Sequence, residues 1–172
     1  NSALVGIDFD AFGGLSPANW KQVNSFNVPY LVSGLTDEDG NTTPYELTLY
    51  GNDGYEIAAV PTANTVPAHI QSLGEIDGAI FTEATLLSAV WSNLIPNQTY
   101  EIYVFGLEDF PEFFDDQQVT IQGAGAPVSF SQLLSDGELY VNGSLGSDLQ
   151  LLDSLAVMVE ADTFGQVIID IE

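Results

Sequence analysis

Residues 94–106, with the sequence LIPNQTYEIYVFG, constrain the fold of this chain more than any other segment. A Pro-Asn-Gln turn at residues 96–98 leads into a stretch in which Tyr100, Ile102 and Val104 form one face. Strict alternation of β-branched and aromatic residues is typical of a strand, and Pro-Asn is typical of the turn before it. Because the opposite face is also largely aromatic, we expect a central strand of a sheet rather than an edge strand.

Similar short segments follow one another along the whole chain. Further strands are predicted at residues 3–10, 28–33, 45–50, 55–60, 79–94, 118–122, 127–132, 138–142, 155–161 and 166–171, with a helical turn as an alternative inside 79–94. The sequence Asn-Asp-Gly at residues 52–54 predicts a hairpin between strands 46–50 and 55–60. The turn at residues 162–165 is expected to pair the last two strands. About ten short strands without a visible linker predict one all-β domain, a sandwich or a barrel, over residues 1–172.

The charge balance excludes several classes of function. The chain has 25 acidic residues against a single lysine, Lys21, and its net charge is −24. Almost no internal salt bridge can form, so self-repulsion must be relieved by salt, bound cations or protonation. A chain without a basic patch cannot release counterions from phosphates, which excludes nucleic acid and anionic lipid as partners. No apolar run is long enough to span a bilayer, so membrane insertion is not expected.

The inventory of reactive side chains predicts a protein that is not an enzyme. Nucleophilic serine or threonine chemistry needs a positioned base, but the only histidine, His69, lies in a proline-containing segment without a nucleophile elbow. Cysteine is absent, which makes a zinc site improbable, and phosphoryl transfer would need more cationic groups than Lys21. A carboxylate pair for glycoside hydrolysis stays open, although no pair stands out.

Calcium is the predicted cofactor because carboxylates and carbonyls are the charged and polar ligands that this chain offers. In the turn at residues 37–41, Asp37 and Asp39 are two residues apart and Gly40 bends the chain, which resembles half of an EF-hand loop. A second candidate arises if the first and last strands are neighbours. Its carboxylates are Asp8, Asp10, Asp170 and Glu172. The alternative for both places is a solvated acidic surface.

Two apolar segments are candidates for contacts between subunits. The acidic segment 107–116 contains Phe110, Phe113 and Phe114, which either fold under the loop or contact a partner. The first predicted strand carries Val5, Ile7 and Phe9 on one face, and it can pair with its own sheet or complete a sheet of a neighbour. The expected partner is another copy of this chain.

Several segments together resemble a known group of secreted bacterial domains. They are the first strand ending in Asp8-Phe9-Asp10, the pair Asn19-Trp20, the turn 35–40, the turn and strand at 94–100, the strand at 119–123 and the final strands at 155–157 and 165–169. The pattern is similar to malectin-like and other galactose-binding-like β-sandwiches. The resemblance implies a two-sheet jelly roll, often with a structural calcium ion, in carbohydrate-binding or surface proteins.

These observations define two expectations for function. The first is a secreted, non-catalytic structural protein that self-assembles into an extracellular filament, tube or surface layer stabilised by calcium. The alternative is a carbohydrate-binding module of the galactose-binding-like type. The chain begins at Asn1 rather than at a methionine, which fits an exported protein located outside the cell or at its surface, with a trimmed cytoplasmic protein as the alternative.

Overall fold

The computed structural model describes residues 4–9, 19–23, 26–51, 55–57, 79–81, 86–106, 117–132, 140–145 and 152–172. Within these residues the chain is almost entirely β-structure. The strands are β1 (Ile7–Asp8), β2 (Lys21–Gln22), β3 (Tyr30–Val32), β4 (Glu46–Tyr50), β5 (Tyr55–Ile57), β6 (Ala79–Phe81), β7 (Leu87–Ser92), β8 (Thr99–Ile102), β9 (Phe105–Gly106), β10 (Gln117–Gln122), β11 (Val128–Gln132), β12 (Tyr140–Val141), β13 (Ser144–Leu145), β14 (Val157–Glu160) and β15 (Val167–Ile171). The only helical element among them is a 3₁₀ turn, η1 (Leu152–Leu155). The predicted all-β class is confirmed.

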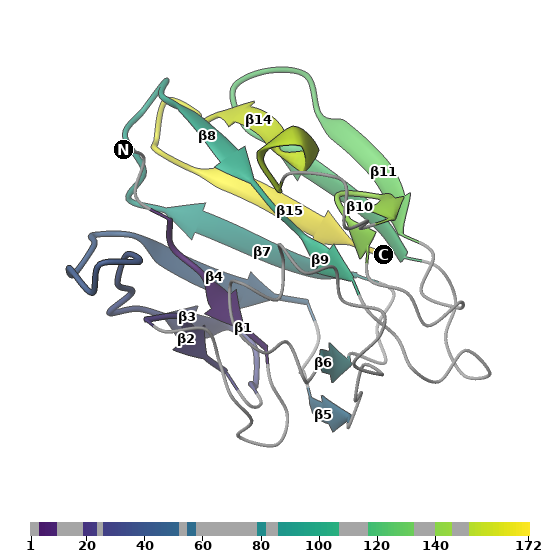
Figure 1. The fold of residues 1–172 in the computed structure, drawn as a ribbon, viewed down its shortest axis with the longest axis horizontal. Helices are drawn as coiled ribbons and strands as arrows, with labels where there is room; N and C mark the ends of the chain where they lie inside the picture. The colour runs from purple at the N-terminus through teal and green to yellow at the C-terminus, as the bar shows by residue number, and fades with distance from the viewer. Residues whose placement is uncertain are drawn as a thin grey trace.

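One antiparallel sheet of six strands forms the base of the molecule. Its order is β11-β10-β15-β7-β4-β3, and Figure 1 shows these strands side by side across the molecule. The register aligns Leu49, Ala89, Ile169 and Ile121 across four neighbouring strands, and all four side chains are buried. Alternation along each strand therefore gives this sheet one apolar face.

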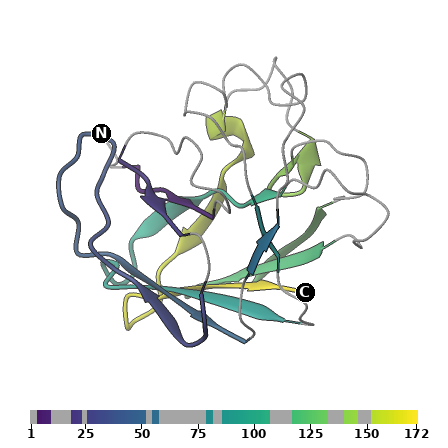
Figure 2. The same cartoon turned by 90° about the horizontal axis from the view of Figure 1, so that it is seen from below.

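Shorter strands cover that apolar face. They form the pair β14-β8, the three-stranded sheet β13-β12-β9 and the parallel pair β1-β2. Figure 2 shows the six-stranded sheet along the bottom, with β1, β8 and η1 above it. Val159, Ala161 and Leu94 pack into one core cluster with the side chains of the large sheet. Burial of apolar side chains between two layers is the defining property of a sandwich, and this prediction is also confirmed.

The segment 94–106 forms two strands rather than one central strand. β8 pairs with β14 and β9 pairs with β12, and the ladder is interrupted between them. Thr99 and Glu101 of β8 are exposed whereas Tyr100 and Ile102 are half-buried, so one face of β8 meets solvent. Among the described residues β8 and β9 each have one neighbouring strand, which contradicts the prediction of a central strand. Aromatic residues on both faces do not show how many neighbours a strand has.

The hairpin predicted at residues 52–54 does not pair the two strands beside it. β4 has β3 on one edge and β7 on the other, and β5 pairs instead with β6. The segment 79–94 contains β6 and β7, as the extended interpretation predicted. A turn sequence states a local backbone preference, but the partner of a strand is decided by which edge remains available.

The last two strands also differ from the predicted hairpin. β14 belongs to the upper layer and β15 lies at the centre of the large sheet, so the turn between them connects the layers. The carboxylate of Asp162 accepts hydrogen bonds from the backbone N–H groups of Phe164 and Gln166, each at 2.8 Å. The turn forms where the sequence predicted it, with Gly165 at a φ of 72°.

Gln132, the last residue of β11, provides a test of core packing. Its side chain is fully buried at 0% exposure, and neither its amide nitrogen nor its amide oxygen has a hydrogen-bond partner. An unsatisfied buried amide costs about 1–3 kcal/mol. We expect Gln132→Met, which keeps the length of the side chain, to increase the free energy of unfolding by about 1–2 kcal/mol in urea denaturation.

The matched control is Gln117→Met, because Gln117 lies directly opposite Gln132 in the ladder and is only half-buried. This control should change the free energy of unfolding by less than about 0.5 kcal/mol. Equal effects of the two substitutions would contradict the assignment of the cost to the buried amide.

Candidate metal and self-association sites

The N-terminal strand pairs within its own chain. The N–H of Lys21 donates to the carbonyl of Gly6 at 3.1 Å, and the N–H of Val23 donates to that of Asp8 at 2.8 Å. Val5, Ile7 and Phe9 are partly buried against the core of the same molecule. The structure thus gives these three residues an intramolecular role, as in the alternative in which the strand pairs within its own chain, and their contact with a second copy stays a prediction.

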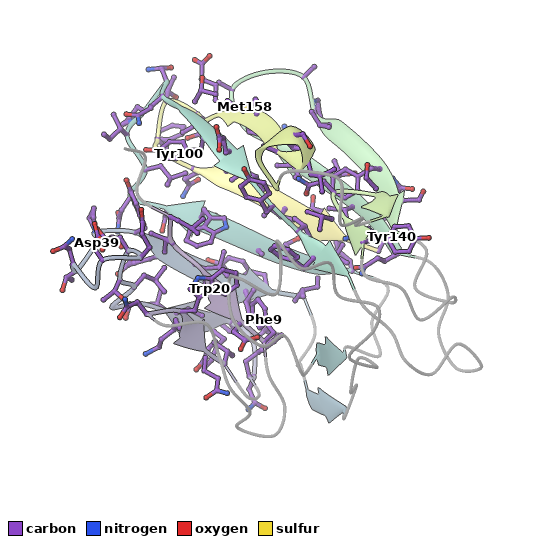
Figure 3. All side chains as sticks on the ribbon, viewed as in Figure 1. Phe9, Trp20, Asp39, Tyr100, Tyr140 and Met158 are labelled. Atoms are coloured by element: carbon purple, nitrogen blue, oxygen red, sulfur yellow. The ribbon has the colours of Figure 1, made fainter. Side chains whose placement is uncertain are left out.

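Trp20 holds this N-terminal strand in place. A Cβ atom placed on Gly6 would lie 2.1 Å from two atoms of the indole ring, so the ring packs directly on the Gly6 backbone. The ring also contacts Phe105 of the upper layer, with 6.4 Å between ring centroids. Figure 3 shows Trp20 beside β1. The two segments 4–9 and 19–23 therefore dock as a unit.

The acidic turn at residues 37–41 is ordered by its own side chains. Asp37 accepts hydrogen bonds from the N–H groups of Asp39 at 3.0 Å and Asn41 at 2.8 Å, and from the amide of Asn41 at 3.0 Å. These hydrogen bonds, first those of Asn41, lower the pKa of Asp37 below its usual 3.8. The side chain of Asp39 points away from the molecule in Figure 3.

The same turn fastens the N-terminal segment. The carboxylate of Glu38 accepts a hydrogen bond from the N–H of Leu4, and its carbonyl accepts one from the amide of Asn19 at 2.9 Å. The hydroxyl of Thr36 donates to the carbonyl of Asn19 at 2.8 Å. The first strand, the Asn-Trp pair and the acidic turn, which the resemblance singled out, therefore lie together. The hydrogen bonds of the turn hold the segments around Leu4 and Asn19 against it.

The hydrogen bonds from Asn41 to Asp37 predict how the pKa of Asp37 changes when Asn41 is replaced. We expect Asn41→Ala to raise the pKa of Asp37 part of the way toward its usual value, because the side-chain amide that lowers it most is lost while the backbone N–H of residue 41 still donates. A lowered pKa in the folded state stabilises the turn at pH values above 3.8, and this contribution disappears as pH falls through the pKa of the folded state. Titration of the Asp37 carboxyl resonance by NMR measures the change. An unaltered pKa in this variant would contradict the assigned cause.

The structure does not bring the six predicted metal ligands together. β15 has β10 and β7 on its two edges, so β1 is not its neighbour and the predicted four-carboxylate edge is wrong. Asp170 accepts a hydrogen bond from the hydroxyl of Ser88, Asp8 is buried at 7% exposure, and Asp10 lies outside the described residues. No three histidine or acidic side chains gather into a group within the described ranges. Calcium binding at Asp37 and Asp39 stays a prediction.

The edges of the large sheet carry no charge. In the described residues β3 and β11 each have a neighbour on one side only, and residues 22–36 and 117–132 around them contain no Asp, Glu, Lys or Arg. The acidic residues of this sheet, Glu46 and Asp170, lie on the interior strands β4 and β15. Natural sheets usually protect exposed edges with charged side chains, and this sheet has the opposite arrangement.

Two further features at one end of the sandwich were missed by sequence reasoning. Phe164 is 83% exposed on the turn between β14 and β15. The end of β14 before this turn lines a half-open hollow of about 340 Å³. Its lining consists of Thr99, Gly123, Gly125, Ala126, Val128, Met158, Val159 and Glu160. The exposed phenylalanine could have been inferred from the turn sequence Asp-Thr-Phe-Gly, but the hollow could not, because its walls come from distant segments.

The predicted phenylalanine loop at residues 107–116 and His69 lie outside the described residues. Within the described part of the chain, no helix has the length and apolar character needed to cross a bilayer. Comparison of the chain with protein-family models, with curated proteins and with solved structures gives no match.

Proposed function

We propose that this chain is a secreted, non-catalytic structural protein whose copies join edge to edge into an extracellular filament, tube or layer. The uncharged edges β3 and β11 of the large sheet carry this proposal. Pairing of β11 in one copy with β3 in the next continues the sheet from molecule to molecule. Because the two edges are different surfaces, this head-to-tail contact leaves one free edge at each end and builds a polymer where the rotation between copies does not close a ring.

Electrostatics explains why these edges suit the contact. Each copy has a net charge of −24, so two copies repel each other over most of their surfaces. Acidic side chains on both β3 and β11 would place like charges directly opposite each other at the joint, and on either strand alone they would add to the repulsion between two copies of net charge −24. Leu31 of β3 is instead 53% exposed and apolar. On β11, the turn at Gly143 packs against Phe130 and the carbonyl of Ser131, which leaves the N-terminal part of the strand for pairing.

Substitutions at the edges test the proposal. We expect Ser129→Glu on β11, and independently Leu31→Glu on β3, to abolish polymers in sedimentation velocity and electron microscopy because they introduce repulsion at the joint. The matched control is Gln122→Glu, which adds the same charge at an exposed position of the interior strand β10. Polymerisation of both edge variants to the level of the unsubstituted protein would contradict the proposal. Monomers of every variant that are retained by immobilised glycans would favour the carbohydrate-binding alternative.

The net charge also predicts that assembly depends on cations. At low ionic strength with a chelator, we expect the melting temperature and the polymer fraction to decrease, because unscreened carboxylates repel within and between copies. Millimolar calcium should restore both more effectively than sodium chloride of equal ionic strength if specific sites contribute. Equal restoration by sodium would assign the effect to screening alone and remove calcium as a cofactor.

A further inference from the structure

The chain contains three sequons of the form Asn-x-Ser/Thr, and the structure gives their asparagine side chains different environments. The sequons are residues 41–43, 97–99 and 142–144. In exported proteins an asparagine in this motif accepts an N-linked oligosaccharide when it lies on an accessible surface segment. The contacts of each side-chain amide therefore indicate which of the three can carry a glycan.

The transfer changes the asparagine amide in a defined way. The amide nitrogen forms a bond to the anomeric carbon of an oligosaccharide that is carried on a lipid diphosphate. The bond from that carbon to the diphosphate oxygen breaks, its electron pair leaves with the diphosphate, and one amide proton passes to the solvent. An unmodified asparagine amide has two N–H donors, so the modified one keeps a single donor and needs room for a sugar ring in place of the other.

Asn142 does not meet this requirement. Its amide donates two hydrogen bonds, to the carbonyl of Ile102 at 2.7 Å and to that of Leu155 at 2.8 Å, and the side chain is half-buried. A sugar on the nitrogen would replace one of these donors and would have to occupy the space beside a partly buried carbonyl group. The folded chain and a glycan at Asn142 therefore exclude each other.

Asn41 is exposed, but its sequon is engaged in the acidic turn. Its amide donates to both carboxylate oxygens of Asp37, at 3.2 and 3.0 Å. The hydroxyl of Thr43, which completes the sequon, donates to the carbonyl of Leu35 at 3.0 Å. Pro44 follows directly and restricts the backbone of Thr43. Modification at Asn41 would thus remove a hydrogen bond that orders this turn.

Asn97 meets the requirement. It lies in the turn before β8, where every residue from 95 to 99 is exposed, and Figure 1 shows the connection from β7 to β8 at the periphery of the molecule. The backbone of the turn is fixed, since the N–H of Asn97 donates to the carbonyl of Ala161 at 3.1 Å and the N–H of Ala161 donates to that of Gln98 at 2.9 Å. The side chains of Asn97 and Thr99 make no hydrogen bond to any residue that the structure describes. A sugar on this amide therefore displaces no hydrogen bond among these residues.

We propose that Asn97 carries an N-linked oligosaccharide and that Asn41 and Asn142 do not. The inference rests on export, which is part of the proposed function, because this lipid-linked transfer acts on chains that leave the cytosol. Asn97 belongs to neither β3 nor β11, so a glycan there leaves the strands of the proposed joint unmodified. It adds a bulky, hydrated group to the turn between β7 and β8.

Peptide mapping by mass spectrometry of the exported protein from its natural source tests the proposal. We expect the peptide that contains Asn97 to carry the mass of an oligosaccharide, and the peptides that contain Asn41 and Asn142 to be unmodified. An unmodified Asn97 would overturn the proposal and would leave this residue with only its role in the turn, where the φ of 60° favours asparagine.

Substitution of the threonine in a sequon separates sequon-directed transfer from other modifications. In the producing cells, we expect Thr99→Ala to remove the glycan completely and Thr99→Ser to keep it, because the motif accepts serine or threonine at this place. The matched control is Thr43→Ala, which destroys the sequon of Asn41 and should leave the mass of the glycan unchanged. A glycan that persists in Thr99→Ala, or that disappears in Thr43→Ala, would contradict the assignment to Asn97.

Electron microscopy of the same preparations tests the edge pairing separately. Polymers of exported protein without a glycan would contradict only the modification of Asn97. Glycosylated chains that never polymerise would support this modification and contradict only the edge pairing.

Discussion

Gly165→Ala is expected to lower the free energy of unfolding by about 2–5 kcal/mol and the melting temperature by on the order of 10 °C. A Cβ atom at this position would lie 2.2 Å from the carbonyl oxygen of Leu94, and the φ of 72° disfavours any side chain. The glycine is buried in the turn that carries the chain from the upper layer to the centre of the large sheet. Relief of the clash would separate two hydrogen-bonded turns. Thermal and urea denaturation measure the effect.

Gly34→Ala separates the two causes. Gly34 has almost the same backbone conformation, with a φ of 68°, but a Cβ atom there meets nothing within 4 Å. This variant should therefore lose only the conformational part, about 1–2 kcal/mol. Equal losses at the two positions would show that the contact with Leu94 contributes nothing.

Asn142→Ala is expected to lower the free energy of unfolding by about 3–5 kcal/mol. The side-chain oxygen of Asn142 accepts a hydrogen bond from the N–H of Val104 at 2.9 Å. Its amide donates to the carbonyl groups of Ile102 at 2.7 Å and Leu155 at 2.8 Å. All three bonds are partly buried, and they satisfy the backbone where the ladder is interrupted between β8 and β9. Removal of the amide takes these three partly buried hydrogen bonds away from the backbone.

Asn93→Ala is the matched control for this prediction. Asn93 also has a positive φ, 61°, and its amide donates to the carbonyl of Pro44 and the carboxylate of Glu46, each at 3.1 Å. These bonds are exposed, so water can replace them and the loss should stay below about 1.5 kcal/mol. A loss at Asn142 no larger than that at Asn93 would contradict the role of burial.

Sequence patterns predicted strands and turns correctly where neighbouring residues alone determine the backbone conformation. Alternation along residues 118–122 and 166–171 identified β10 and β15, because a strand with one buried face needs apolar side chains at every second position. The turn at residues 162–165 was recognised because glycine tolerates the positive φ that it requires. The all-β class followed from the sum of such segments.

The candidate site was less accessible from the sequence. Asp37 was singled out as a metal ligand for its spacing with Asp39, which stays a prediction, and the structure shows its carboxylate accepting hydrogen bonds from the N–H groups of its own turn. The hollow at the end of β14 is assembled from Thr99, the segment 123–128 and β14, which are far apart in the chain. The spacing of residues along the sequence does not show that these distant segments lie side by side in the folded chain.

The sequence alone determined that this chain is an all-β protein with an acidic surface, because side-chain alternation and composition fix those properties residue by residue. Only the tertiary structure decided which strands are neighbours: β5 pairs with β6 instead of β4, and β14 and β15 separate into two layers. The physical reason is that every strand offers the same backbone hydrogen bonds. The choice of partner therefore depends on which apolar faces fill the common core, and that is a property of the whole chain.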